Sequence, residues 1–308
     1  MTDDEATPKA AVVALMKGTV PERRDEIASL WENYNPAVVL VADARRITLN
    51  ADKDRIQLDI KTMDVFWLIA FGGWRAIETY SPHVVLSAAG GWTVAELMNV
   101  DPSLDDVERA YKECRAAAQS LIDAADAEAA HWPPDLPRPS ADRNALNHPQ
   151  YQSAFDLACL AVAFTLFHEF RHVMLHRDDQ RPKNLREEEM ACDVWAREFM
   201  TAKLARYAED HGHDYRQVSR KRAMGLALAA LILHEITPFW DHGGNQQYFS
   251  VAARLQAILD NTPLPENDHF WVFAASLLIG ILRQRNVPID APPMSAYALT
   301  RNLIAKLG

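Results

Sequence analysis

The pattern of hydrophobic and polar positions divides the chain into an N-terminal part that mixes helices with strands and a C-terminal part that is helical throughout. Residues 1–35 show the spacing of amphipathic helices. A short apolar run at 38–41 and period-two alternation at 47–49 and 56–60 predict strands, the last two forming a hairpin around a polar turn. From residue 63 the apolar positions return to a helical period.

A stretch with five prolines, residues 132–149, separates the two parts. Before it, Ser103 and Asp106 have the spacing of a capping box and predict an alanine-rich helix that runs to about residue 130. The expected fold class is α+β, mostly helical, with a small N-terminal sheet. We expect one domain, 1–308, with lobes at about 1–131 and 150–308, because the N-terminal part has too little sheet to fold alone.

Composition indicates a folded protein, since 49% of the 308 residues are hydrophobic and 24% are charged. The net charge of −10 disfavours a nucleic-acid partner. The one basic cluster has the spacing of a solvated helix face; it comprises Arg216, Arg220, Lys221 and Arg222. No nucleic-acid partner is therefore expected.

Apolar runs such as 226–233 and 270–282 are shorter than the roughly 20 residues that cross a bilayer. The N-terminus is acidic, whereas a secretory signal begins with positive charge. We therefore expect a cytoplasmic protein without a membrane partner. Cys114, Cys159 and Cys192 lie far apart and form no CxxC pair, so neither a disulfide framework nor a cysteine zinc site is indicated.

The strongest chemical signal is HEFRH at 168–172, which follows AFDLACLAVAFTLF, a segment that is apolar around nearly the whole helix. Such a helix is buried, so the motif lies within a core. His168 and His172 are four residues apart and share a helical face, the arrangement by which two imidazoles bind one zinc ion. Glu169 is rotated away from them and can act as general base toward the attacking water.

A catalytic zinc site needs a third protein ligand. His176 continues the four-residue spacing, but it lies roughly 12 Å beyond His168 along the helix axis, so three such ligands cannot close on one ion. A metzincin-type glycine turn and distant histidine are absent from the residues that follow. His176 is therefore expected to be a helix-end residue.

The segment NLREEEMACD at 184–193 offers acidic alternatives. Asn184 and Glu187 have capping-box spacing, which gives Glu187 a structural role at the start of a second helix. Glu189 and Asp193 share a face, so Glu189 can bind zinc while Asp193 accepts the free ring N–H of a ligating histidine. Glu188 is the second candidate ligand. The alternative is that all three glutamates simply solvate the first turn.

HExxH followed by a helix carrying ExxxD is similar to the gluzincin metallopeptidases. That resemblance implies a zincin-like core, His168, His172 and Glu189 as zinc ligands, Glu169 as base, and Asp193 as orienting acid. The string EMACDVWAREFM also resembles the glutamate helix of ImmA/IrrE-type peptidases, which cleave repressors.

The order of features along the chain resembles the peptidase U49 family most. These features are an N-terminal α/β part, an apolar helix into HEFRHVMLH past mid-chain, and then EExxACDxWA. The resemblance implies a cytoplasmic bacterial protease that acts in phage exclusion. A translation factor as substrate and a phage-derived activator are the partners that it suggests.

Further polar candidates lie in HEITPFWDHGGNQQYFSVAAR, which contains His234, His242, Tyr248 and Arg254. We expect His242 to stabilise the oxyanion, because the glycines after it permit close approach of a substrate. In zincins the substrate lies along an edge strand above the metal, and the hairpin at 46–60 is the candidate for that edge.

The expected function is therefore zinc-dependent hydrolysis of a peptide bond in a cytoplasmic protein, with phage exclusion as the expected setting. One alternative is an ImmA/IrrE-like repressor-cleaving peptidase, which predicts a DNA-binding or sensor segment that is not evident in the sequence. Another is a zinc-stabilised binding protein without catalysis.

Overall fold

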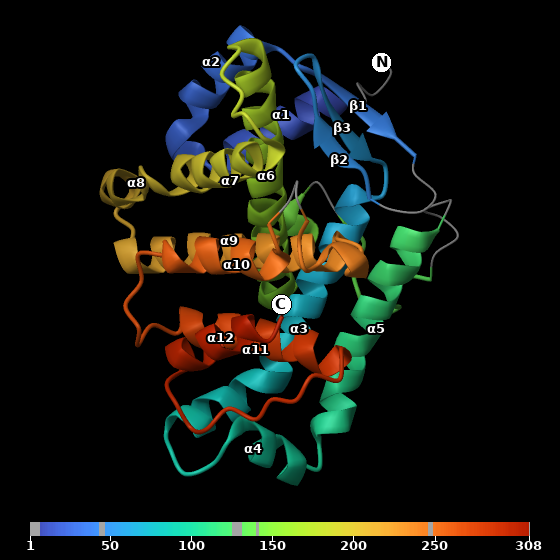
Figure 1. Ribbon diagram of the computed structural model, residues 1–308, viewed down its shortest axis with the longest axis vertical. Coiled ribbons are helices and arrows are strands. Elements are labelled where there is room, and N and C mark those ends of the chain that lie inside the picture. Colours follow the sequence, from blue (N-terminus) through green and yellow to red (C-terminus); the bar gives the residue numbers. More distant parts are fainter. Residues whose placement is uncertain (1–6, 43–46, 125–130, 140–141, 246–248, 308) are drawn as a thin grey trace.

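Helices form most of the structure, together with one three-stranded sheet, as the sequence predicts for an α+β protein. The computed structural model describes residues 7–42, 47–124, 131–139, 142–245 and 249–307 (Figure 1). The strands are β1 (Ala37–Val41), β2 (Leu49–Ala51) and β3 (Arg55–Asp59). The helices are α1 (Pro8–Thr19), α2 (Arg24–Tyr34), α3 (Thr62–Ala88), α4 (Val94–Val100), α5 (Leu104–Asp123), α6 (Pro149–Arg177), α7 (Leu185–Thr201), α8 (Leu204–His211), α9 (Tyr215–Ile236), α10 (Val251–Asp260), α11 (Phe270–Gln284) and α12 (Ala296–Ala305).

The predicted hairpin is confirmed, since β2 and β3 pair antiparallel with Leu49 opposite Leu58. β1 also pairs with β3, but in parallel, so the strand order is β1-β3-β2. Periodicity could not show this parallel pairing, because it depends on the path between the strands. The order leaves β2 at the sheet edge that lies against α6.

The predicted capping box at Ser103 is wrong. The Ser103 hydroxyl donates to an Asp101 carboxylate oxygen at 2.7 Å and makes no capping bond to α5. A complete capping box instead begins α4, where Thr93 and Glu96 bond each other's backbone N–H groups. α5 ends at Asp123, and residues 125–130 of its predicted extension lie outside the described residues.

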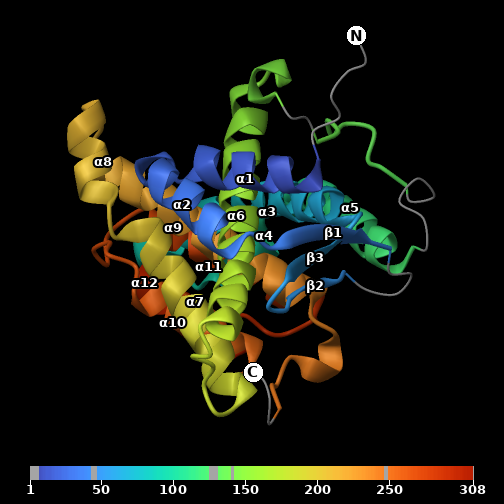
Figure 2. The same cartoon turned by 90° about the horizontal axis from the view of Figure 1, so that it is seen from above.

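α6 is the central helix, and α1, α3, α7 and α9 pack against it. Figure 2 shows α6 running between α7 on one side and the sheet on the other. By length and composition α6 could cross a membrane, but 72% of its apolar window is buried inside the protein. A core helix meets the same test, and the buried surroundings of α6 match the prediction from its all-round apolar sequence.

A close helix contact in the core joins α6 to α9. An added Cβ at Gly225 of α9 would stand 2.5 Å from the Leu160 Cβ, so only glycine permits this crossing. Leu160 lies two turns before His168, and the contact therefore fixes the part of α6 that leads into the HEFRH motif.

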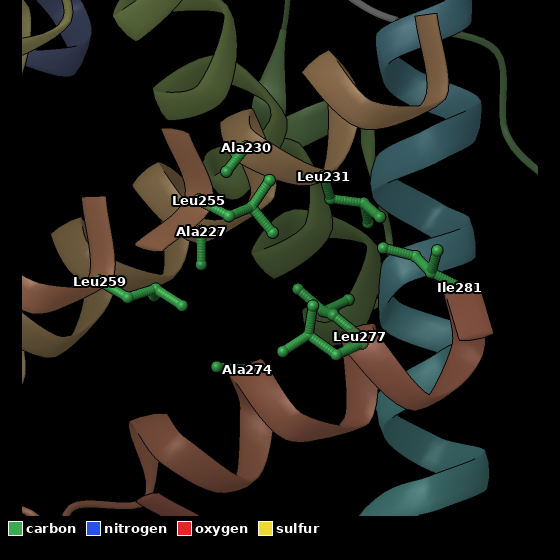
Figure 3. Close-up of a pocket in the computed structure, with 9 residues that line it drawn as sticks. Ala227, Ala230, Leu231, Leu255, Leu259, Ala274, Leu277 and Ile281 are labelled. Atoms are coloured by element: carbon green, nitrogen blue, oxygen red, sulfur yellow. The ribbon is translucent and has the colours of Figure 1, made fainter. Parts of the chain in front are cut away.

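Apolar side chains line the contact between α9, α10 and α11 (Figure 3). Alanine and leucine residues there, including Ala227, Ala230 and Leu277, surround an apolar cavity of about 10 Å³. An apolar cavity of this size holds no water. α9, α10 and α11 therefore form a tightly packed support for the central helix α6.

We expect Gly225→Ala to destabilise the protein by about 2 kcal/mol, because overpacking against Leu160 outweighs the better helix propensity of alanine. Gly18→Ala is the matched control, since Gly18 lies in α1 with nothing within 4 Å of an added Cβ. It should stabilise the protein by up to about 1 kcal/mol. Urea denaturation measures both changes, and equal effects of the two substitutions would contradict the close crossing.

Candidate metal centre

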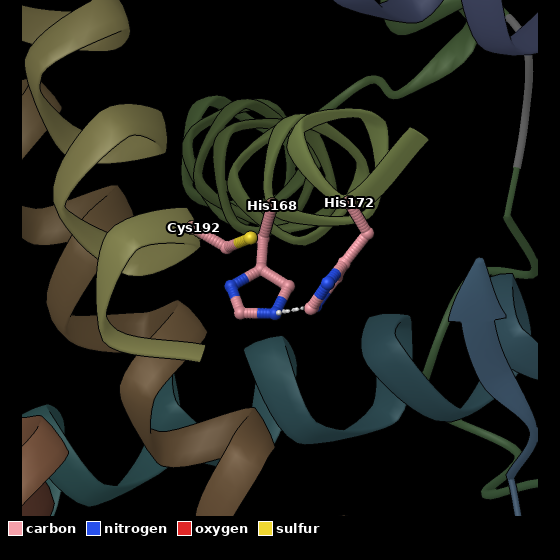
Figure 4. A group of neighbouring side chains, drawn as sticks. All are labelled: His168, His172 and Cys192. Atoms are coloured by element: carbon pink, nitrogen blue, oxygen red, sulfur yellow. Dashed lines mark hydrogen bonds between the residues drawn. The ribbon is translucent and has the colours of Figure 1, made fainter. Parts of the chain in front are cut away.

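Two histidines of α6 and one glutamate of α7 converge on one point. The Nε2 atoms of His168 and His172 are 3.2 Å apart. The Glu189 carboxylate places Oε2 at 3.4 Å from the His168 Nε2 and Oε1 at 3.4 Å from the His172 Nε2. The structure thus brings these three predicted residues together. Figure 4 shows both imidazole rings projecting from the same side of α6.

The separations match those of ligands around one metal ion. Ligand atoms about 2.0–2.1 Å from a tetrahedral zinc ion are separated from each other by about 3.3 Å. The three distances between His168, His172 and Glu189 are 3.2, 3.4 and 3.4 Å. The site therefore has the donor types and the spacing that a zinc ion requires.

Asp193 lies one turn after Glu189 on α7 and faces the other nitrogen of His168. Its Oδ1 is 2.8 Å from the His168 Nδ1. Arg254 of α10 donates to both oxygens of Asp193 at 2.7 Å and lies 3.9 Å from the Glu189 carboxylate. This guanidinium fixes the carboxylate that orients His168, so α10 also contributes to the site.

Glu188 makes the corresponding contact with the second histidine. Its side chain is 1% exposed, and Oε1 lies 2.8 Å from the His172 Nδ1. The same oxygen is 3.1 Å from the His176 Nε2, and Arg181 donates to Oε2 at 2.9 Å. Glu188, weighed above as a zinc ligand, thus contacts the outer nitrogen of His172, and His172, His176 and Glu188 also offer ligand atoms within 4.8 Å of one another.

These contacts determine where the imidazole lone pairs point. In a neutral imidazole whose Nδ1–H donates to a carboxylate, Nε2 is left as an acceptor, and this is the form that binds a metal ion. Two acceptor nitrogens and the Glu189 oxygens then face one another within 3.4 Å. Such an arrangement is repulsive without a positive charge between the atoms.

The electrostatics of the site favour that positive charge. Burial lowers the pKa of His168, but Asp193 and Glu189 outweigh burial and raise the pKa to about 10. Burial raises the pKa of Glu189, yet hydrogen bonds from His168 and His172, when these rings are protonated at Nε2, bring it well below its usual range. The carboxylate is therefore ionised, and its surroundings stabilise a cation.

Cys192, which the cysteine spacing gave no reason to connect with zinc, lies next to the site. Its sulfur lies beside His168 (Figure 4), and His168, His172 and Cys192 offer ligand atoms within 4.8 Å of one another. Burial and the nearby carboxylates raise the pKa of the Cys192 thiol. Because zinc binds the thiolate, this thiol is a poorer ligand than the ionised Glu189.

Glu169 is buried beside the histidine pair. Burial raises the pKa of Glu169, and the charges of His168 and His172 oppose that rise. A carboxylate with a raised pKa accepts a proton more readily than one in water, as a general base requires.

The structure places His242 after α9. Its Nε2 lies 2.8 Å from the Thr237 carbonyl oxygen, and its ring stands 4.4 Å from that of His234. These contacts tie the imidazole to the end of α9, and its predicted oxyanion role stays a prediction. Tyr248 lies outside the described residues.

Each residue of the basic cluster is paired with an acid. Arg216 and Arg220 bind Asp268, Lys221 binds Asp156, and Arg222 binds Glu22. The cations of the cluster are thus held in ion pairs within the protein.

Sequence reasoning missed Arg254 as the partner of Asp193, and it missed the contact of Glu188 with His172. Glu188 lies five residues before Asp193, so the two do not have the four-residue spacing of Glu189 and Asp193. Arg254 lies 61 residues from Asp193 in the sequence. The available signal was the run of acidic residues at 187–189, of which Glu188 and Glu189 contact the histidines of α6.

Comparison with known proteins bears on the whole arrangement. No curated protein and no solved structure matches the chain. The family model of peptidase U49 matches residues 56–274, which span β3 to α11 and include the complete centre. This match covers more than half of the sequence. The chain therefore belongs to the peptidase U49 family.

Proposed function

We propose that the protein is a zinc-dependent endopeptidase that cleaves a protein substrate in the cytoplasm. The observation that carries the proposal is the triangle of ligand atoms from His168, His172 and Glu189, with Glu169 buried beside it. Family membership supports a peptidase, and the donor set supports the metal.

In this proposal His168, His172 and Glu189 hold the zinc ion. Bound zinc would polarise the scissile carbonyl and lower the pKa of water. Four carboxylates surround the centre, those of Glu169, Glu188, Glu189 and Asp193, and two guanidinium groups, Arg181 and Arg254, offset two of them. With neutral imidazoles, two negative charges remain, which is the charge that a divalent cation balances.

Glu169 is the proposed general base. It takes a proton from the attacking water and delivers that proton to the leaving amine, and its raised pKa suits both steps. Asp193 and Glu188 hold the two imidazoles in the tautomer that presents Nε2 to the ion. We retain His242 as a proposed oxyanion donor, which requires its bond to Thr237 to be exchanged when substrate binds.

The proposed substrate is an extended segment of a protein that pairs with the outer edge of β2. β2 is an edge strand and packs against α6, the helix that carries the histidines. The turn after β2 is bonded to the same helix, because Arg177 donates to the Lys53 carbonyl oxygen at 2.6 Å. A substrate strand that paired with β2 would lie along α6, and its backbone N–H and C=O groups would form hydrogen bonds with β2.

The cellular setting that we propose is phage exclusion, with a translation factor as substrate and a phage-derived activator as a further partner. The basis for this setting is what the sequence resemblance to the peptidase U49 family implies. Neither a nucleic acid nor a membrane is part of the proposal.

We expect Glu169→Gln to reduce cleavage by about 10² to 10⁴-fold, because it removes the base and leaves the ligands in place. Zinc-loaded wild type is incubated with a cytoplasmic extract of phage-infected bacteria, and new protein N-termini are mapped by mass spectrometry. The variant should retain wild-type zinc content and melting temperature but generate none of these N-termini. Equal cleavage by the variant would contradict the mechanism, and zinc binding without any new N-termini in wild type would favour a non-catalytic zinc protein.

Glu188→Gln tests the orienting contact. We expect about 10- to 100-fold weaker zinc binding, because an amide is a poorer acceptor for the His172 Nδ1–H and loses its ion pair with Arg181. Glu187→Gln is the control with the same chemistry at the exposed neighbouring position. Competition with a fluorescent chelator measures both affinities, and similar affinities for the two variants would rule out this role for Glu188.

A further inference from the structure

A cavity of about 560 Å³ lies between α4, α5 and the C-terminal end of α11, away from the candidate metal centre. α4 is at one end of the long axis of the molecule, whereas α7 is in the other half (Figure 1). Pockets that bind small molecules have about 300–1,000 Å³. The cavity is therefore large enough for a ligand that the peptidase centre does not need.

The charged part of the lining is a triad with an excess of positive charge. Glu108 is 1% exposed and accepts hydrogen bonds from Arg283 at 2.6 Å, and the Lys112 Nζ lies 2.7 Å from its other oxygen. Burial raises the pKa of Glu108, but Arg283, Lys112 and Tyr80 outweigh burial and lower it to about 2. The triad is thus one anion between two cations, in a chain whose net charge is −10.

Both cations keep donors for a further partner. A guanidinium has five N–H donors and an ammonium has three, so the bonds to Glu108 leave some unused on each. The Lys112 side chain is 50% exposed and that of Arg283 is 29% exposed, and both line the cavity. Because Glu108 anchors them, a ligand would meet cations that are already held in place.

The rest of the lining combines the polar side chains of Asn99, Gln284 and Asn286 with a group of apolar ones. The apolar group includes Met98 from α4 and Val287, Pro288 and Ile289 from the segment after α11. The turn that starts this segment caps α11, since Val287 N–H donates to the Leu282 carbonyl oxygen and Asn286 has a left-handed φ of 55°. These capping bonds satisfy carbonyl groups at the helix end that would otherwise repel an anion.

We propose that this cavity binds a small organic monocarboxylate. Its apolar body would pack against Met98, Val287 and Ile289, and its carboxylate would accept hydrogen bonds from Lys112 and Arg283. A cationic ligand is disfavoured because the one lining carboxylate, Glu108, is already bonded to three donors.

Isothermal titration calorimetry of the full chain with benzoate tests the proposal, and benzamide serves as the uncharged probe of the same shape. Hexanoate serves as a second, aliphatic carboxylate. Benzoate should bind at least about tenfold more tightly than benzamide, because only the anion forms charge-assisted hydrogen bonds. Equal affinities for benzoate and benzamide would overturn the proposal. So would the absence of saturable binding of both benzoate and hexanoate at concentrations up to about 20 mM.

Lys112→Gln identifies the site. We expect it to weaken benzoate binding by about tenfold and to leave benzamide binding unchanged. Lys221→Gln is the matched control, because Lys221 is also a half-exposed lysine paired with an acid, Asp156, at another surface. Melting curves of both variants verify folding. An equal effect of the two substitutions on benzoate binding would show that the benzoate carboxylate does not bind at Lys112, and it would contradict the proposal.

Discussion

The contact between α6 and α7 brings three imidazoles and four carboxylates together, and the rest of the structure must stabilise that concentration of charge. Burying ionised groups is costly unless each one has a partner. Here Asp193 is held by His168 and Arg254, and Glu188 is held by His172, His176 and Arg181. The excess negative charge that remains lies at the point where the two Nε2 atoms and the Glu189 carboxylate meet.

The packing around α6 explains why that point is well defined. α6 is enclosed on several sides, and Gly225 allows α9 to cross it at a distance that no other residue would permit. α10 supplies Arg254, so the orientation of His168 depends on helices far apart in the sequence. A rigid support of this kind keeps ligand atoms at fixed separations before a metal ion binds.

Local patterns were sufficient to predict the parts of the site that lie on one helix. Four-residue spacing predicted the shared direction of His168 and His172, and the all-round apolar segment before them predicted the burial of α6. The Asn184 side chain caps α7 as its spacing predicted. The helical C-terminal part and the hairpin of β2 and β3 followed from periodicity in the same way.

Contacts between elements could not be predicted in this way. The bond of Glu188 to His172, the approach of Arg254 and the position of Cys192 all depend on how α7 and α10 dock on α6. The parallel pairing of β1 with β3 depends on the chain path for the same reason. At Ser103 a local rule failed because a nearer acceptor, Asp101, competes for the hydroxyl.

The ligand set of the bound metal tests the central claim most directly, because Glu189 and Cys192 approach the histidine pair from the same helix. X-ray absorption at the zinc edge of the loaded protein distinguishes oxygen from sulfur ligands. We expect two imidazole nitrogens and carboxylate oxygen at about 2.0–2.2 Å and no sulfur, with zinc lost in Glu189→Ala and retained in Cys192→Ser. A sulfur ligand at about 2.3 Å, or full zinc content in Glu189→Ala, would contradict the proposed centre.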